Sequence, residues 1–250
     1  MVGAIIQARM TSSRLPGKVL MEIDGRPVID YLFERLSYCK YLQIILLATT
    51  TNTEDDALVS YAIKRNIPYF RGSEHDVLDR YYNAAEKFGI KHILRITADC
   101  PLVDPKVCDL IIECYQKEKV DFVVTGSSFA EGLDCEIFSR QVLNTVHQKA
   151  KRISEREHLT LYIHNHSETF KKITLENDTD DGRYRFTIDE PADFEVVKSI
   201  ILNLYRKDTF PFGFKEIKQF IDAHPEVFQI NANIIRNEGL IKSLENEYKI

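Results

Sequence analysis

Several features that mark secreted or membrane proteins are missing from this sequence. Its five cysteines are odd in number and form no C-x-x-C pair, which argues against a disulfide scaffold and a cysteine zinc site. No apolar run approaches the roughly 18 residues that a membrane-spanning helix needs. The chain also opens without a charged leader followed by an apolar segment. We therefore expect a cytoplasmic protein with reduced thiols and no membrane partner.

Long basic blocks are missing as well. The chain carries 33 Lys and Arg against 38 Asp and Glu, a formal charge of −5, so a nucleic acid is not an expected partner. Neither G-x-x-x-x-G-K-[ST] nor G-x-G-x-x-G occurs, which argues against a P-loop ATPase and against a dinucleotide site. The 44% of hydrophobic residues is typical of a globular chain.

Short apolar runs alternate with segments of helical period, which predicts a three-layer α/β/α fold with a mainly parallel mixed sheet. The predicted strands are residues 2–8, 43–48, 68–70, 92–97, 121–125, 134–138, 170–175 and 183–188. The predicted helices are residues 27–39, after 53, 76–88, 105–117, after 139, from about 155, 191–205, 213–223 and 234–248. We expect a single domain over residues 1–250, with a core of about 1–206 and a helical extension of about 207–250.

The first predicted strand runs into the segment Q-A-R-M-T-S-S-R-L-P-G-K, residues 7–18. A loop rich in small residues can direct backbone N–H groups at phosphate oxygens, while Arg9, Arg14 and Lys18 add positive charge. Open α/β sheets bind ligands at this edge. The alternative is a solvated basic loop, but three cations beside Gly17, directly after a buried strand, favour a triphosphate site.

Two further strands each end in an acid followed by a proline. Asp99 stands in R-I-T-A-D-C-P-L-V-D-P and Asp189 in R-F-T-I-D-E-P-A-D-F. For either acid alone, a turn or helix-capping role is as good an explanation as a metal ligand. If both strands lie in one sheet, the two carboxylates would meet at one magnesium ion. Asp104 is predicted to be the N-cap of the next helix.

In these motifs the chain resembles the cytidylyltransferases that include the acylneuraminate and 3-deoxy-manno-octulosonate enzymes, and especially the branch named after spore coat polysaccharide biosynthesis protein F. The resemblance spans residues 3 to about 200. Its carriers also include R-G-S-E-H-D-V-L-D-R-Y, G-L-D-C-E-I-F and S-E-R-E-H-L-T. It implies a fold of the nucleotide-diphospho-sugar transferase type, CTP as a substrate and a homodimer.

The resemblance also implies roles for individual residues on the nucleotide side. It assigns catalysis to Arg9, Lys18, Asp99 and Asp189, and Mg²⁺ binding to Asp99 and Asp189. It assigns nucleotide binding to Ala8, Arg9, Ser13, Arg14, Lys18, Thr50, Arg71, Gly72 and Asp99. The threonines of A-T-T-T-N-T-E-D-D are placed near the base, although a threonine run at a strand end also reflects β-propensity.

Two segments are expected to reach the acceptor. Asp134 and Glu136 alternate with apolar residues and so share one face of a short strand, while Arg156 and His158 stand in S-E-R-E-H-L-T. In that segment the serine and the second glutamate, Ser154 and Glu157, also have the spacing of a capping box. Arg80 is a further acceptor residue, or else it pairs with a neighbouring acid. The acceptor-binding residues are thus predicted as Arg80, Asp134, Glu136, Arg156 and His158.

The implied reaction transfers CMP from CTP to a small anionic acceptor and releases pyrophosphate, for surface polysaccharide biosynthesis. The segment T-A-D-C-P departs from the Q-G-D-E-P-like segment of the sugar-acid enzymes, so a sugar acid, a sugar phosphate and a related anionic metabolite all stay open as acceptors. Two alternatives remain: a glycosyltransferase of related fold that uses a nucleotide sugar, and a non-catalytic nucleotide-binding subunit.

Overall fold

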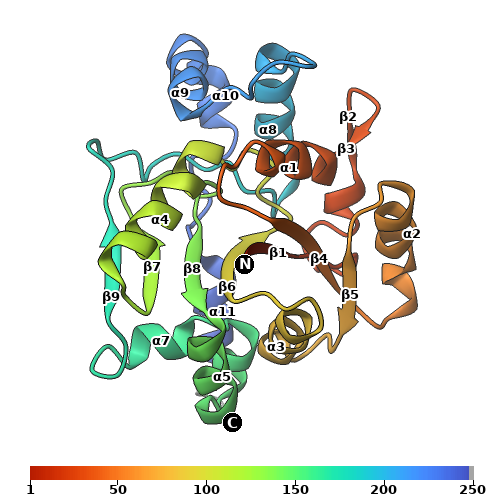
Figure 1. The fold of residues 1–250 in the computed structure, drawn as a ribbon. Coiled ribbons are helices and arrows are strands. Elements are labelled where there is room, and N and C mark those ends of the chain that lie inside the picture. The colour runs from red at the N-terminus through yellow and green to blue at the C-terminus, as the bar shows by residue number, and fades with distance from the viewer. Residues whose placement is uncertain (248–250) are drawn as a thin grey trace.

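In the computed structural model, which describes residues 1–247, seven strands form one sheet in the order β5-β4-β1-β6-β8-β7-β9 (Figure 1). Its strands are β1 (Val2–Gln7), β4 (Ile44–Thr50), β5 (Tyr69–Gly72), β6 (His92–Thr97), β7 (Phe122–Thr125), β8 (Glu136–Ser139) and β9 (Lys172–Leu175). Only β8 runs antiparallel to its neighbours β6 and β7. The other pairings are parallel, which confirms the prediction of a mainly parallel mixed sheet.

Most of the helices fall close to their predicted positions, but the short helices at residues 161–165 and 225–229 are not among the predicted ones. They are α1 (Val28–Ser37), α2 (Asp56–Lys64), α3 (Val77–Lys87), α4 (Pro105–Glu118), α5 (Arg140–Lys149), α6 (Ile153–Glu157), α7 (Leu161–Asn165), α8 (Pro191–Leu204), α9 (Phe214–Ala223), α10 (Pro225–Gln229) and α11 (Glu238–Glu247). Two 3₁₀ turns, η1 (Lys18–Leu20) and η2 (Thr53–Asp55), and a hairpin of β2 (Glu22–Ile23) and β3 (Arg26–Pro27) complete the set. None of the described helices is long and apolar enough to cross a membrane.

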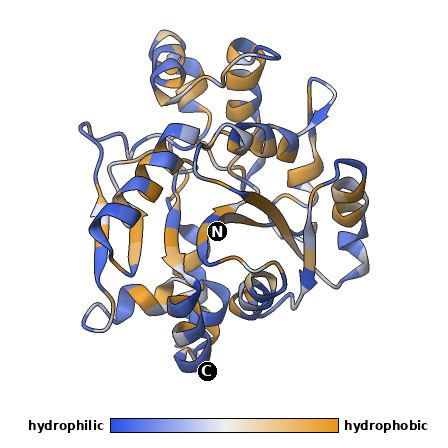
Figure 2. Cartoon of the chain, viewed as in Figure 1, coloured by the Kyte–Doolittle hydropathy of each residue, from blue (hydrophilic) through white to orange (hydrophobic). Residues whose placement is uncertain are grey.

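Helices cover both faces of the sheet because its strands are apolar on both sides. In β1, Ala4 and Ile6 pack in one core with side chains of α1, α2 and α4. Ile5, between them, packs in the other core with α3, α5 and α7. Figure 2 shows the result as apolar central strands and helices whose outward surfaces are mostly hydrophilic. This is the three-layer α/β/α arrangement that the sequence predicts.

A third core lies beyond the sheet, where α8, α9 and α10 gather on one side of the molecule (Figure 1). Ile23 of β2 packs there with Ile200 of α8 and Ile217 of α9, each at most 1% exposed. Asp104 caps α4, as predicted, by accepting a hydrogen bond from Lys106 N at 2.9 Å. The same carboxylate accepts from Phe214 N at 3.0 Å, so it also fixes the start of α9.

Three local predictions are wrong. Residues 183–188 form no strand of the sheet, because their backbone bonds go to two different segments: Phe186 N donates to Glu131 O, and Ile188 N donates to Asp99 O. The predicted capping box in S-E-R-E-H-L-T is absent, because Ser154 lies inside α6 and its hydroxyl donates to Glu247. The predicted helix 234–248 begins only at 238, and position 248 lies outside the described residues.

A candidate active site at the carboxyl edge of the sheet

The ends of β1 and β6 bring two predicted motifs together. The strands are parallel neighbours, and Gln7 at the end of β1 pairs in register with Thr97 at the end of β6. Ala98 N then donates to Gln7 O at 3.0 Å. Because both chains leave the sheet at the same edge, the segment 8–17 and the turn that carries Asp99 begin side by side.

The loop 8–17 is closed at its base by backbone contacts. Gly17 N donates to Met10 O at 2.9 Å, and Met10 N donates to Asp55 Oδ1 at 2.7 Å. Gly17 has a φ of 72°, in the left-handed region that glycine adopts without steric cost. The reversal places Lys18 at the start of η1, within reach of the turn after β6.

Lys18 lies between the two predicted metal ligands. Its Nζ donates to Asp99 Oδ2 at 2.6 Å and to Asp189 Oδ1 at 2.7 Å, and its side chain is only 9% exposed. Burial lowers the pKa of Lys18, but the charges of the two carboxylates outweigh burial and raise it. Burial likewise raises the pKa of Asp99, and Lys18 more than reverses that effect. Lys18 and Asp99 are therefore both charged at neutral pH.

Asp189 reaches this position although its segment is not a strand of the sheet. Its Oδ2 accepts from Arg185 Nη2 at 3.1 Å, and Arg185 Nε donates to Asp193 Oδ1 at 2.9 Å. Asp193, in the first turn of α8, is fully buried and also accepts from Asp189 N at 3.0 Å. Neither supporting residue is predicted from the sequence, where their only signal is the interval of four that separates Arg185, Asp189 and Asp193.

A cleft of about 1080 Å³ opens above these groups. Most of the predicted site residues line it: Ala8, Arg9, Ser13, Arg14, Lys18, Arg80, Asp99, Asp134, Glu136, His158 and Asp189. They come from the ends of β1 and β6, from α3, from β8 and the turn before it, and from segments near α6 and α8. The fold thus brings together both the nucleotide-side and the acceptor-side residues of the predicted site.

Four other predicted residues lie outside the cleft lining: Thr50, Arg71, Gly72 and Arg156. Arg71 Nε donates to Thr50 O at 2.8 Å, so this side chain fastens the loop after β4. Gly72 lies beside it, where an added Cβ would come within 3.1 Å of the Arg80 side chain. Arg156 Nε donates to Asp76 Oδ2 at 2.6 Å. In this structure these residues support the walls of the cleft.

The two arginines of the loop differ in their partners. Arg9 is 45% exposed and has a single ion-pair contact among the described residues, with Glu74 at 3.5 Å. Arg14 contacts three carboxylates: Asp189 at 3.1 Å, Glu190 at 3.5 Å and Glu238 at 2.6 Å. Arg14 is therefore held among acids at the position where the resemblance places phosphate oxygens.

The part of the cleft that is predicted to bind the acceptor holds two carboxylates in different states. Burial raises the pKa of Glu136, but Arg95 at 2.9 Å outweighs burial and lowers that pKa to about 2. Burial raises the pKa of Asp134 to about 6, against the opposing charge of Arg236 at 2.6 Å. Arg95 was not singled out from the sequence. Its role follows from the register of β6 with β8, which pairs it with Glu136.

Three polar atoms in the wall of the cleft are buried without a hydrogen-bond partner: Gln7 Oε1, Arg80 Nε and Arg95 Nε. Arg80 is only 2% exposed, and its Nη1 donates to the backbone oxygen of Ser73. A buried donor or acceptor without a partner costs about 1–3 kcal/mol. These atoms therefore suit a polar ligand that supplies the missing partners.

The C-terminal segment forms the remaining wall. Residues 236–240, 242 and 243 line the cleft, and α11 packs against α6. Ser243 Oγ donates to Glu157 Oε2 at 2.8 Å and lies 3.1 Å from His158 Nε2. Burial here lowers the pKa of His158. The sequence alone does not predict the role of the C-terminal helices, because contacts between residues some 85 positions apart leave no local pattern.

Residues 3–234 match the cytidylyltransferase family. The chain is 36% identical over 232 residues to an uncharacterized protein of Methanocaldococcus jannaschii, with 92% of this chain and 94% of that protein covered. It is 34% identical over 203 residues to the spore coat polysaccharide biosynthesis protein SpsF of Bacillus subtilis, with 78% and 84% covered. A solved cytidylyltransferase structure from Leptospira borgpetersenii superposes with a TM-score of 0.85 at 34% identity, with 91% of this chain and 96% of that chain covered.

Proposed function

Because this chain belongs to the cytidylyltransferase family, it is a CTP-dependent nucleotidyltransferase, and we propose that it couples CMP to a small anionic acceptor and releases pyrophosphate. A sugar acid, a sugar phosphate or a related anionic metabolite is the proposed acceptor, and surface polysaccharide biosynthesis is the proposed setting. The name of the Bacillus subtilis relative supports that setting. The observation that carries the proposal is Lys18, held between Asp99 and Asp189 beneath the loop 8–17.

In the proposed reaction an oxygen of the acceptor attacks the α-phosphorus of CTP. The new O–P bond forms while the bond from that phosphorus to pyrophosphate breaks, and pyrophosphate leaves with the electron pair. Arg9, Arg14 and Lys18 neutralise the charge of the phosphates, and the loop 8–17 orients them. Lys18 exchanges a carboxylate partner for a phosphate oxygen when the nucleotide binds.

On the acceptor side, the proposed roles follow from which donors are unpaired. Arg80 Nε and Arg95 Nε are buried donors without partners and suit an anionic oxygen of the acceptor. Glu136, kept ionised by Arg95, suits a hydroxyl that donates to it. An acceptor oxygen that belongs to a phosphate is already deprotonated, whereas a hydroxyl acceptor passes its proton to water as the O–P bond forms.

Magnesium is the proposed metal, and Asp99 and Asp189 fit it. Their carboxylate oxygens both reach one cation, the Lys18 ammonium, at 2.6 and 2.7 Å. Within residues 1–247 no group of three or more His, Cys, Asp or Glu side chains could hold a metal ion, so phosphate oxygens and water would complete the shell. Mg²⁺ typically binds in this way. When bound, it neutralises charge on the phosphates.

The test is a thermal-shift comparison of CTP, UTP, ATP and GTP, each with magnesium. We expect CTP alone to raise the melting temperature markedly, and Asp99→Asn and Asp189→Asn to diminish that rise. Asp178→Asn serves as a matched control, because Asp178 is an exposed acid that does not line the cleft. Acceptors of the three proposed types are then assayed for pyrophosphate release.

Two outcomes would contradict the proposal. A melting temperature that none of the four nucleotides raises would contradict CTP as the substrate. A nucleoside diphosphate, rather than pyrophosphate, as the product would instead indicate the glycosyltransferase alternative.

A further inference from the structure

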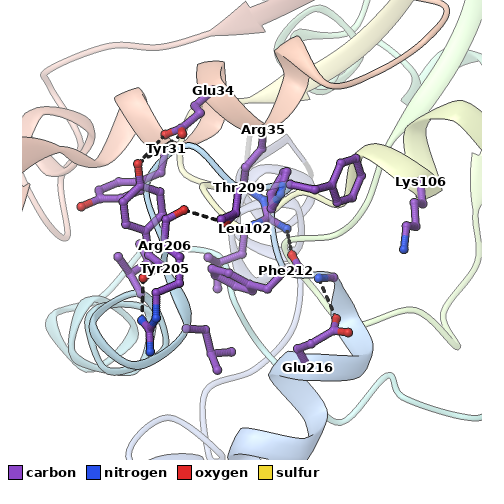
Figure 3. A pocket seen from close by; sticks show the side chains of 15 residues that line it. Tyr31, Glu34, Arg35, Leu102, Lys106, Tyr205, Arg206, Thr209, Phe212 and Glu216 are labelled. Atoms are coloured by element: carbon purple, nitrogen blue, oxygen red, sulfur yellow. Dashed lines mark hydrogen bonds between the residues drawn. The ribbon is translucent and has the colours of Figure 1, made fainter.

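A second cavity, of about 310 Å³, lies apart from the cleft (Figure 3). It is enclosed by α1, the start of α4, the end of α8 and the connector 205–213 that leads to α9. No residue that lines it also lines the cleft. The volume falls at the lower end of the range typical of small-molecule sites.

One part of the cavity wall is apolar. Leu102, Ile201 and Leu204 contribute aliphatic side chains, and Phe210 and Phe212 contribute aromatic rings. Phe210 is 51% exposed although it is a large apolar residue, so it is only partly covered by the chain itself. This part of the wall suits a hydrocarbon or aromatic group.

The other part of the wall carries cations without carboxylate partners. Arg35 is only 4% exposed, yet its guanidinium donates to two carbonyls, Val103 O and Phe212 O, both at 2.7 Å. Burial lowers the pKa of Arg35 to about 10, opposed most strongly by Asp104, which makes no ion pair with it. Lys106 at the same cavity is exposed and, within residues 1–247, has no ion-pair partner either.

The two acids in the wall also have partners other than Arg35 and Lys106. Glu34 is engaged by Arg26 at 2.7 Å, and Glu216 Oε2 accepts from Gly213 N at 2.8 Å (Figure 3 shows the latter contact). Both carboxylates thus have partners that hold them. Counted with Arg206, the wall carries three cations against these two carboxylates, so the cavity combines an apolar surface with a net charge of +1.

The cations lie on the side where the two phenylalanines enter. Lys106 Nζ is 5.4 Å from the ring centroid of Phe210, and the Arg35 guanidinium carbon is 4.7 Å from that of Phe212. The aliphatic residues come from α8 and from Leu102, in the turn between β6 and α4. A ligand in the cavity would thus meet both positive charge and apolar side chains.

We propose that this cavity binds a small organic anion with an aromatic or alicyclic body, whose charged group faces Arg35 and Lys106. The body packs against Leu102, Ile201 and Leu204 and removes apolar surface from water. Because Leu102 follows Asp99 in the same turn, an occupant contacts the segment that positions the carboxylate of the active site. The site is separate from the one that takes CTP.

The probe for the test is 8-anilinonaphthalene-1-sulfonate, an aromatic anion whose fluorescence rises in apolar sites. We expect one saturable class of binding that Phe210→Ala and Lys106→Ala each weaken by about tenfold, the cost of losing an aromatic contact or a charge-assisted bond. Both side chains are at the rim, and unchanged melting temperatures will show that the variants fold. Ile63→Ala and Lys215→Ala are matched controls, because both residues are exposed and lie outside the cavity.

The dye titration is repeated in the presence of saturating CTP and magnesium. Dye binding that survives CTP and falls only in the two cavity variants supports the proposal. Dye that CTP displaces belongs to the cleft and overturns it. Equal dye binding in all four variants overturns it as well. This outcome does not depend on whether CTP is the substrate of the enzyme.

Discussion

Lys18 dominates the electrostatics of the cleft, because it is the cation that both Asp99 and Asp189 contact. Its ammonium keeps two carboxylates close together without repulsion. A magnesium ion at the same carboxylates would do the same. Lys18 and a magnesium ion at the proposed site would therefore stabilise the same pair of carboxylates.

Replacing Lys18 by methionine tests that link. We expect Lys18→Met to lower the free energy of unfolding at pH 7 by about 2 kcal/mol, because two nearby carboxylates lose their shared cation. Magnesium should then raise the melting temperature of the variant more than that of the wild type. Lys198→Met, at an exposed lysine of α8, is the control and should show neither effect. An equal magnesium response in the variant and the wild type would argue against a metal at Asp99 and Asp189.

The helix α11 forms a wall of the cleft and lies beyond the family match, which ends at residue 234, while α11 begins at 238. Glu238, its first residue, accepts from Arg14 at 2.6 Å and from Lys242 at 2.7 Å. The carboxylate thus contacts a cation that the proposed function assigns to the phosphates of CTP. If Arg14 binds these phosphates as proposed, Glu238 would compete with the nucleotide for it.

We expect Glu238→Gln to tighten CTP binding by about fivefold, because the neutral amide competes less well for the guanidinium. The measurement is a titration of CTP with magnesium by calorimetry. Glu245→Gln is the matched control, because Glu245 lies in the same helix and is exposed outside the cleft. Unchanged or weaker binding in Glu238→Gln would mean that this contact helps to build the site instead of opposing the nucleotide.

At the scale of the whole molecule, the ion pair of Arg95 and Glu136 ties two central strands of the sheet, β6 and β8. The pKa of Glu136 is lowered to about 2 from an ordinary value of 4.5. Between these values the unfolded chain binds more protons than the folded chain, so stability rises with pH. The contribution is complete above about pH 4.5 and is lost as the pH falls toward 2.

The expected size of this contribution is on the order of 3 kcal/mol, since the Glu136 side chain is only 12% exposed. Urea unfolding at pH 5 and pH 3 measures it. Glu136→Gln should be less stable than the wild type at pH 5, and the difference should shrink at pH 3. Glu195→Gln, at an exposed acid of α8, should follow the wild type at both values. A difference that is constant with pH would show that Glu136 does not titrate with the fold.

The sequence by itself determined the layers and most of the cleft. Alternating apolar runs and helical periods define β1, β4 and β6 and the helices between them, because burial on both faces of a parallel sheet requires that pattern. The motifs around Lys18 and Asp99 follow β1 and β6, whose shared direction brings their ends together. The single domain and the homodimer stay predictions.

Only the tertiary structure decided how the acids meet and what closes the cleft. Asp189 reaches Lys18 through Arg185 and Asp193 and not through a strand of the sheet, since the bonds of residues 183–188 go to two separate segments. Glu238 meets Arg14 across more than two hundred positions of the chain. Such contacts depend on where whole elements pack, and periodicity along the chain reports only on the neighbours of each residue.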